Sequence, residues 1–226
     1  MFGGAIVASR NRSNPLALAV LLSLFERPMH PYEVATTLRR RRKDDSVRLN
    51  YGSLYAVVGS LERRGLIAEL ETEREGRLPE RTVYCLTDPG RIEAHDWLAE
   101  LLSTPIHEYP AFIAALSFLP ALPPSEAVAL LVERAASLEL QLAQTRGARE
   151  LLETRSLPRL LWVEAEFASV LCEAELEYVR RLMRDITEDR LGGIEWWRAI
   201  HESEGLAPPP PVGGDWSELV AELHAR

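Results

Sequence analysis

The chain has 226 residues, of which 46% are hydrophobic and 27% charged, proportions typical of globular proteins and not of disordered ones. Its longest apolar runs, such as residues 15–22, are shorter than the roughly 18 residues of a membrane span, and the apolar start at residues 1–8 lacks the preceding charge of an export signal. Cys85 and Cys172 lie too far apart to suggest a disulfide framework, so we expect a cytoplasmic protein that does not contact membranes.

The net charge of −8 is unevenly distributed along the chain. Residues 1–104 carry 15 basic and 14 acidic side chains, a net charge of +1, whereas residues 105–226 carry 11 and 20, a net charge of −9. Five bases are consecutive, at positions 39–43. A polyanion could dock on this run, but such a run is also common at the solvated C-terminal end of a helix.

Three short helices are predicted at the start of the chain. The first spans about 14–26, because Asn14 can cap its free amides and Pro15 suits the first helical position. The second begins at His30-Pro31, and the third runs from the capping residue Asn50 to Gly65. The apolar sides of the second and third are expected to be Tyr32, Val34, Ala35 and Leu38, and Leu54, Tyr55, Val58 and Leu61.

A β-hairpin and a fourth helix follow. Residues 66–70 and 82–86 have the pattern of strands, and the polar stretch between them contains Gly and Pro, which predicts a long hairpin tip. Residues 87–90 can cap the fourth helix, whose apolar side is expected to be Ile92, His95, Trp97, Leu98, Leu101 and Leu102. These elements make up an expected first domain, residues 1–104.

From Pro105 onward the pattern predicts only helices, at about 111–119, 124–153 and 158–189. They form an expected second domain, residues 105–204. The four prolines within 205–214 indicate a stiff linker, and 216–224 can form one last short helix. The predicted fold class is therefore mainly α with a small β-hairpin.

Both long helices carry an apolar row with the alternating three- and four-residue spacing of a coiled coil. The rows are Val128, Leu131, Ala135, Leu138 and Leu142, and Leu160, Val163, Phe167, Val170, Ala174 and Tyr178. The rows could pack within their own domain. A partner chain is the favoured interpretation, because two long helices with little else nearby cover each other's apolar faces poorly. We expect a homodimer held by Val128, Leu131, Leu138, Leu142, Val163, Phe167 and Val170.

Signatures of catalysis and of metal binding do not occur in the sequence. It contains no P-loop, GxGxxG, GxSxG or HExxH motif. The five histidines are scattered, and neither they nor the cysteines have the spacing of zinc ligands. We expect neither an enzyme nor a bound metal or cofactor.

The order of the elements favours DNA as the partner, because three helices followed by a hairpin place the third helix to enter the major groove. At its start, short polar side chains and free amides can reach phosphates or base edges. Arginines at the hairpin tip can meet phosphates or a narrow minor groove, and the less favoured alternative is that they serve solubility alone. The predicted DNA contacts are Tyr32, Arg39, Arg40, Asn50, Tyr51, Ser53, Tyr55, Arg64, Arg74, Arg77 and Arg81.

Several motifs in order resemble the PadR-like family of transcriptional regulators, over about residues 14–102. They are Asn14-Pro15-Leu16 with the rest of the first helix, His30-Pro31-Tyr32-Glu33-Val34, Gly52-Ser53-Leu54-Tyr55, Leu61 to Ile67, Tyr84 to Thr87, and Gly90 followed by Trp97. Two residues depart from the family pattern: Pro31 stands where a glycine is usual, and Tyr51 where a smaller residue is common. Pro31 suits a helix start, whereas Tyr51 is expected to affect which operator is read.

The resemblance implies a winged-helix DNA-binding domain, a helical C-terminal dimerisation domain, and repression relieved by a small molecule or another signal. Trp97 is then a candidate for stacking on a small aromatic effector, although core packing is its favoured role. The leading hypothesis is a dimeric repressor whose third helices read the two half-sites of a palindromic operator, about one helical turn apart. The alternative is a protein-interaction module that has lost specific DNA binding.

Overall fold

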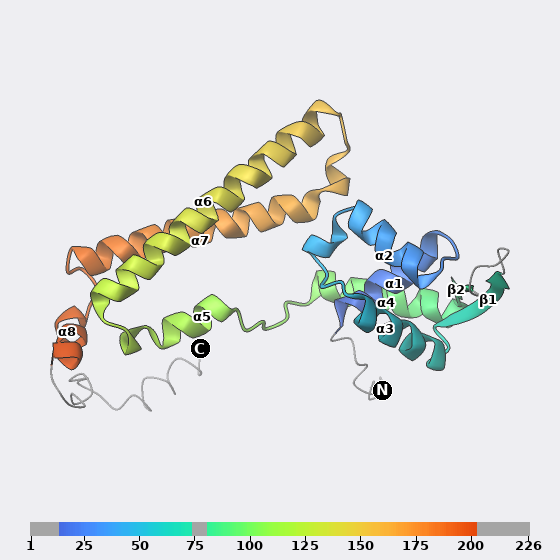
Figure 1. Ribbon diagram of the computed structural model, residues 1–226, viewed down its shortest axis with the longest axis horizontal. Helices are drawn as coiled ribbons and strands as arrows, with labels where there is room; N and C mark the ends of the chain where they lie inside the picture. The colour runs from blue at the N-terminus through green and yellow to red at the C-terminus, as the bar shows by residue number, and fades with distance from the viewer. Residues whose placement is uncertain (1–13, 74–80, 203–226) are drawn as a thin grey trace, which may run out of the picture. The chain divides into compact units, whose positions relative to one another are not determined.

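The computed structural model of the protein describes residues 14–73 and 81–202, with the side chains at 71–73 and 81 left aside (Figure 1). Contacts divide the chain into two units, one up to Glu108 and the other from Tyr109 on. Within the described ranges, the first unit has four α-helices and a two-stranded sheet, and the second has four α-helices. The predicted fold class, mainly α with one β-hairpin, is confirmed.

The first unit follows the predicted order of helices and strands. Its elements are α1 (Pro15–Glu26), α2 (Pro31–Arg40), α3 (Tyr51–Arg63), β1 (Ile67–Glu73), β2 (Arg81–Leu86) and α4 (Asp88–Ser103). The two strands are antiparallel, with Ile67 opposite Leu86, and the register shifts between Glu69 and Glu71. Met29 and Tyr84 exchange two backbone hydrogen bonds of 3.1 Å, which ties the segment before α2 to the hairpin.

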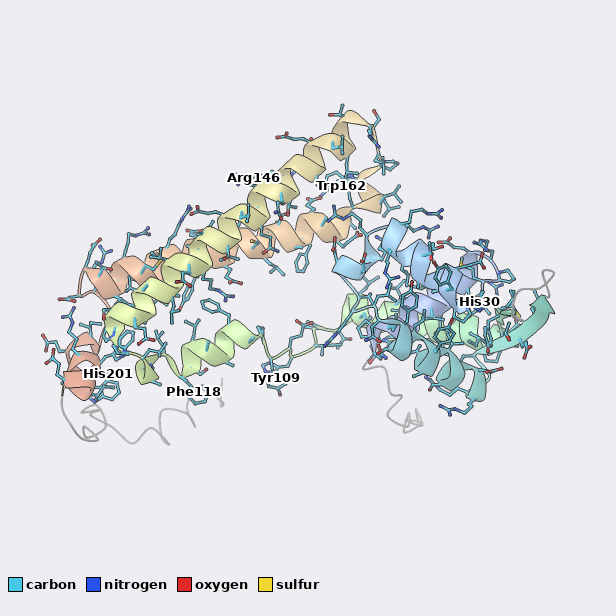
Figure 2. All side chains as sticks on the ribbon, in the orientation of Figure 1. His30, Tyr109, Phe118, Arg146, Trp162 and His201 are labelled. Carbon is cyan, nitrogen blue, oxygen red and sulfur yellow. The ribbon has the colours of Figure 1, made fainter. Side chains whose placement is uncertain are left out.

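Side-chain caps fix where the helices of this unit begin, as the sequence predicts. The Asn14 side chain accepts a hydrogen bond from the Leu16 amide at 3.1 Å, and the Asn50 side chain accepts one from the Ser53 amide at 2.7 Å. His30, labelled in Figure 2, accepts a bond from the Tyr32 amide through Nδ1. Each cap satisfies an amide that has no partner within its own helix.

The core of the first unit lies between α1, α2, α3, α4 and the hairpin. Val20 and Leu21 of α1 are completely buried, as is Leu54 of α3. Gly90 of α4 lies so close to the residue that precedes β1 that an added Cβ would be 1.9 Å from the Leu66 carbonyl oxygen. This approach fixes how α4 is turned toward the core.

The predicted apolar sides of α2, α3 and α4 need correction at several positions. Within the described residues, one side of α4 is covered, through Gly90, Glu93, Ala94 and Trp97, while Ile92 and Leu102 are exposed. Tyr32 and Tyr55 are also exposed, at 56% and 51%. The predictions placed residues inward because they are apolar. In α4 the tight contact at Gly90 decides which side faces the core, and in α2 and α3 the two tyrosines lie on the side that faces away from it.

The second unit is built on an antiparallel pair of long helices, visible in Figure 1. Its elements are α5 (Ala111–Ser117), α6 (Pro124–Thr154), α7 (Val163–Thr187) and α8 (Ile194–Glu202). The helix predicted over 158–189 is divided: a 3-10 turn at Arg159–Leu161 precedes Trp162, where the backbone leaves helical geometry, and α7 begins at Val163. Trp162 lies at this corner (Figure 2).

Helix α8 was not predicted. It packs on the second unit through Ile194 and Trp197, which are buried, and the Trp197 indole N–H donates to the Leu122 carbonyl at 2.7 Å. Its nine residues follow Gly192 and Gly193, a signal for a turn that obscured the short amphipathic pattern beyond it.

The apolar row predicted on α6 is covered by α7 of the same chain. Leu131, Leu138 and Leu142 are 5%, 8% and 5% exposed, and they belong to one core with Leu176 and Val179. The prediction that these three leucines bind a partner chain is therefore corrected, because α7 already occupies them. Ala127 completes the buried row, and Val128, also predicted as a partner contact, is half-buried against it.

Helix α7 turns a different row inward from the one predicted as its seam. The buried row is Cys172, Leu176, Val179, Leu182 and Ile186. Val163, Phe167 and Val170, from the predicted seam, remain 48%, 63% and 55% exposed. This helix thus has two apolar rows, and the described part of the chain covers one of them.

Two predicted features lie outside the described residues: the tip of the hairpin and the linker with its last short helix at 205–226. Among the helices that are described, none has the length and apolar character needed to cross a membrane.

Candidate nucleic-acid interface

The start of α3 and the exposed side of α2 form one surface of the first unit. Helix α3 begins at Tyr51, directly after its capping residue Asn50. The first amides of a helix have no intrahelical acceptors and carry the positive end of the helix dipole. Tyr32 and Arg39 from α2 contact Tyr51, and Tyr55 follows Tyr51 by one turn of α3. Arg40 follows Arg39 at the end of α2, and all five side chains are exposed. We refer to these five residues as the α2–α3 face.

An aromatic and cationic stack lies at the centre of the α2–α3 face. The rings of Tyr32 and Tyr51 are nearly parallel, with an interplanar angle of 8° and centroids 6.1 Å apart. The Arg39 guanidinium carbon lies 4.5 Å from the centroid of the Tyr51 ring, and Arg39 Nη1 donates to the Tyr51 hydroxyl at 2.5 Å. Tyr51 therefore joins the beginning of α3 to the far end of α2.

The bases at positions 39–43 are not equivalent. Arg41 forms a two-pronged ion pair with Glu26, and this bond holds the pKa of the Glu26 carboxyl below its usual value. Arg42 pairs with Asp45 at 3.1 Å. Arg40 is exposed and has no ion pair within the described part of the chain. Arg39 and Arg40 are thus the members of the run that keep cationic groups on the α2–α3 face.

The remaining predicted contacts fall into three groups. Asn50 and Ser53 lie at the start of α3, where the Asn50 oxygen is occupied by the cap and Ser53 is half-buried. Arg64, at the opposite end of α3, is hydrogen-bonded at 3.4 Å to the buried carboxylate of Glu93 on α4. Arg64 therefore links α3 to α4 in the structure. Arg74, Arg77 and the side chain of Arg81 lie outside the described residues.

Trp97, the predicted effector contact, is only 1% exposed and packs in the core of the first unit. Its indole N–H has no hydrogen-bond partner among the described residues. A planar ligand could not stack on this ring without opening the core. The burial of Trp97 therefore supports core packing, which was the favoured of its two expected roles.

Sequence reasoning missed Arg48. This residue is exposed, lies two positions before the cap of α3, and has no hydrogen bond or ion pair within the described ranges. Its position in the run-up to a capped helix was the available signal, but it was hidden by the stronger cluster at 39–43.

Comparison with known families identifies the first unit. Residues 20–96 match the model of the "Transcriptional regulator PadR-like family", which covers α2, α3, both strands and most of α1 and α4. Residues 20–96 therefore form a domain of the PadR-like family of transcriptional regulators. No curated protein matches it. The family consists of regulators, which agrees with the prediction that the chain is not an enzyme.

Solved structures share the fold over both units of this chain. Bacillus subtilis PadR in complex with operator DNA has a TM-score of 0.62 at 21% identity, over 76% of this chain and 99% of that one. The same protein with p-coumaric acid has a TM-score of 0.62 at 19% identity, over 76% and 98%. A PadR-like regulator from Bacillus cereus has a TM-score of 0.53 at 15% identity, over 77% and 99%. At these identities, the likeness establishes the fold.

Proposed function

We propose that this chain is a homodimeric repressor that binds a palindromic operator with the α2–α3 face. The observation that carries the proposal is the stack of Tyr32, Tyr51 and Arg39 at the start of α3. It places a planar cation and two aromatic rings where the free amides of the helix can meet a phosphate. Arg40 adds a cation that has no ion pair within the described residues.

The distribution of charge supports docking through the first unit. The second half of the chain has a net charge of −9, which repels DNA, whereas residues 10–64 carry 11 bases against 5 acids. Binding to a polyanion is driven by the local cations and not by the net charge of the chain. The acidic half therefore favours an orientation in which the first unit alone contacts the duplex. Arg48 and the hairpin arginines Arg74, Arg77 and Arg81 would add contacts to the DNA beside the major groove.

The second apolar row of α7 supports a homodimer. Val163, Phe167 and Val170 repeat at four- and three-residue spacing, and each is about half exposed or more. Tyr178 extends the same row along α7 at 38% exposure. An exposed row of this length on an already paired helix fits a matching row of a second copy. Two copies would present two α3 helices to two half-sites.

Release from the operator by a small aromatic effector is the third part of the proposal. Its support is the likeness to Bacillus subtilis PadR, one structure of which contains p-coumaric acid. Because Trp97 is closed inside the core, we place no effector there. Added p-coumaric acid should lower the affinity of the chain for its operator if the effector class is shared, and an unchanged affinity would remove this part alone.

The DNA-binding part is tested by fluorescence-anisotropy titration of DNA from upstream of the chain's own gene, in the presence of a scrambled competitor. The chain should bind with competitor-resistant affinity, and Arg40→Ala should weaken binding to all sequences and lower the salt dependence by about one ion. Arg63→Ala, an exposed cation outside the α2–α3 face, is the matched control and should leave binding unchanged. Weak, sequence-independent retention on every fragment tried would favour the protein-interaction alternative.

A further inference from the structure

The α2–α3 face contains a spacing that places two of its side chains on the same side of α2. Tyr32 and Arg39 are seven residues apart, which is two turns of a helix. Tyr51, from the next helix, contacts both: its ring is stacked with Tyr32 and lies under the Arg39 guanidinium. A residue without an aromatic ring at position 51 could make neither contact.

Tyr51 restricts the Arg39 guanidinium in two ways. The ring attracts the cation at 4.5 Å, and the hydroxyl accepts a hydrogen bond from Nη1 at 2.5 Å. The N–H groups on Nε and Nη2 have no acceptor among the described residues. These two nitrogens form one edge of the planar group, so Arg39 keeps a two-donor edge of fixed shape.

We propose that Arg39 reads a guanine of the operator and that Tyr51 is the residue that positions it. Guanine presents two adjacent acceptors, N7 and O6, in the major groove, and a two-donor arginine edge is their commonest partner. This inference rests on the proposed function, since it assigns a role within the operator complex. It makes Tyr51 a determinant of specificity although it is not itself the reading group.

A base contact fits the geometry better than a phosphate contact does. A phosphate is held by any mobile cation, and Arg40, the next residue, already supplies one without an ion pair in the described chain. Holding the Arg39 group by both a ring and a hydroxyl adds orientation, which a charge contact does not require. Orientation is what separates one base from another.

The experiment starts from the operator selected by the wild-type chain out of a random DNA pool. Failure of the wild-type chain to enrich any sequence would overturn the proposed function itself, before Arg39 is tested. With an operator in hand, Arg39→Lys keeps the charge but loses the two-donor edge. It should weaken operator binding by about 5- to 150-fold, with non-specific affinity and salt dependence retained.

Substitution of one operator guanine at a time by 7-deazaguanine locates the base. At one guanine in each half-site, this substitution should lower the affinity of the wild-type chain for the operator. It should not lower the affinity of the Arg39→Lys chain. Arg91→Lys is the matched control, because Arg91 also lies over an aromatic ring, Phe25 at 5.1 Å, away from α2 and α3. It should bind the operator as the wild type does.

Tyr51 is tested through its coupling to Arg39. Tyr51→Phe keeps the ring and removes the hydroxyl, and should weaken operator binding by about 2- to 10-fold. The same substitution should cost nothing further in the Arg39→Lys chain, because the group that it positions is already lost. Equal losses in both backgrounds would show that Tyr51 acts independently and would overturn its positioning role.

A second result would overturn the base contact. If Arg39→Lys binds the operator as well as the wild type, while Arg39→Ala weakens binding equally on all sequences and lowers the salt dependence by about one ion, Arg39 contacts a phosphate. Thermal unfolding of every variant is followed in parallel, and because Arg39 and Tyr51 are exposed, unfolding is expected to stay unchanged.

Discussion

The two units of the chain bury their apolar residues in different ways. In the first, α1 is surrounded by α3, α4 and the hairpin, so Val20 and Leu21 are fully enclosed. In the second, α6 and α7 cover one row of each other, and Phe167 and Val170 on the opposite side of α7 stay open. A layer of elements around a central helix can close its own core, whereas a pair of long helices leaves apolar surface for another molecule.

This difference separates the work of the two units. The first unit is complete as a fold and exposes tyrosines and arginines on the α2–α3 face, which suits a polar partner. The second exposes aliphatic side chains and phenylalanine in a regular row, which suits an apolar partner. We infer that the first unit supplies recognition and the second supplies assembly.

The largest expected effect distinguishes the two rows of the second unit. Leu138→Asp puts a charge into the core shared by α6 and α7, and should destabilise that helix pair by about 3–5 kcal/mol. Phe167→Asp puts the same charge on the exposed row, and should leave thermal unfolding of the helix pair nearly unchanged while converting the proposed dimer to monomers. Circular dichroism and sedimentation measure the two effects.

Ser169→Asp is the control for these substitutions, because Ser169 lies two residues from Phe167 on another side of α7. It should sediment as the wild type does. A Phe167→Asp chain that still sediments as a dimer would place the partner surface elsewhere.

The next effect tests how tightly the first unit is closed. In Gly90→Ala the new Cβ meets the Leu66 carbonyl oxygen, and the fold should lose about 3 kcal/mol of stability. Gly59→Ala in α3 is the control: nothing lies within 4 Å of its added Cβ, so it should stabilise the helix by about 0.5–1 kcal/mol. The free energies of unfolding are measured in urea. Equal changes in the two variants would refute the tight approach of α4 to Leu66.

A smaller effect concerns Arg64, which is tied to Glu93 and lies away from the α2–α3 face. Arg64→Ala takes one partner from a buried carboxylate and should cost about 1–2 kcal/mol of stability. Its salt dependence of DNA binding should equal that of the wild type, because no phosphate contact is lost. The neighbouring Arg63→Ala should change neither quantity. A reduced salt dependence for Arg64→Ala would restore Arg64 as a DNA contact.

The smallest effect is a dependence on pH. The hydrogen bond from Arg41 lowers the pKa of Glu26 in the folded chain, so this pair stabilises the fold above pH 4.5 and its contribution is lost as the pH falls through the lowered value. Both side chains are nearly half exposed, which limits the contribution to about 0.2–1 kcal/mol. Glu26→Gln should therefore be less stable than the wild type at pH 7 and equally stable near pH 2. If the two chains differed in stability by the same amount at pH 7 and near pH 2, the ion pair would not be the cause of the pH dependence.

The first unit could be predicted from sequence because its signals are local. Asn14, His30, Asn50 and Thr87 each cap the helix that they were expected to begin. The orientation of α4 could not be predicted, since it depends on the contact between Gly90 and Leu66, which come together only in the folded chain. The stack of Tyr32, Tyr51 and Arg39 was hidden for the same reason, although each residue was named as a DNA contact.

In the second unit, a repeat of apolar residues showed that a neighbouring helix was needed but not which one. The row on α6 matches the inner row of α7 as well as it would match a partner chain. The choice is decided by the turn around Trp162, which brings α7 back along α6. Because Cys172, Leu176 and Val179 then face inward, the more regular row with Phe167 is the one left outside.

The central claim is that one unit reads DNA and the other pairs the copies, and hydroxyl-radical footprinting of the DNA upstream of the chain's own gene tests it most directly. The wild-type chain should protect two segments about 10 base pairs apart, and Phe167→Asp, at the same concentration, should lose both while remaining folded. Protection of a single segment, unaltered by Phe167→Asp, would contradict the division of recognition and assembly between the two units.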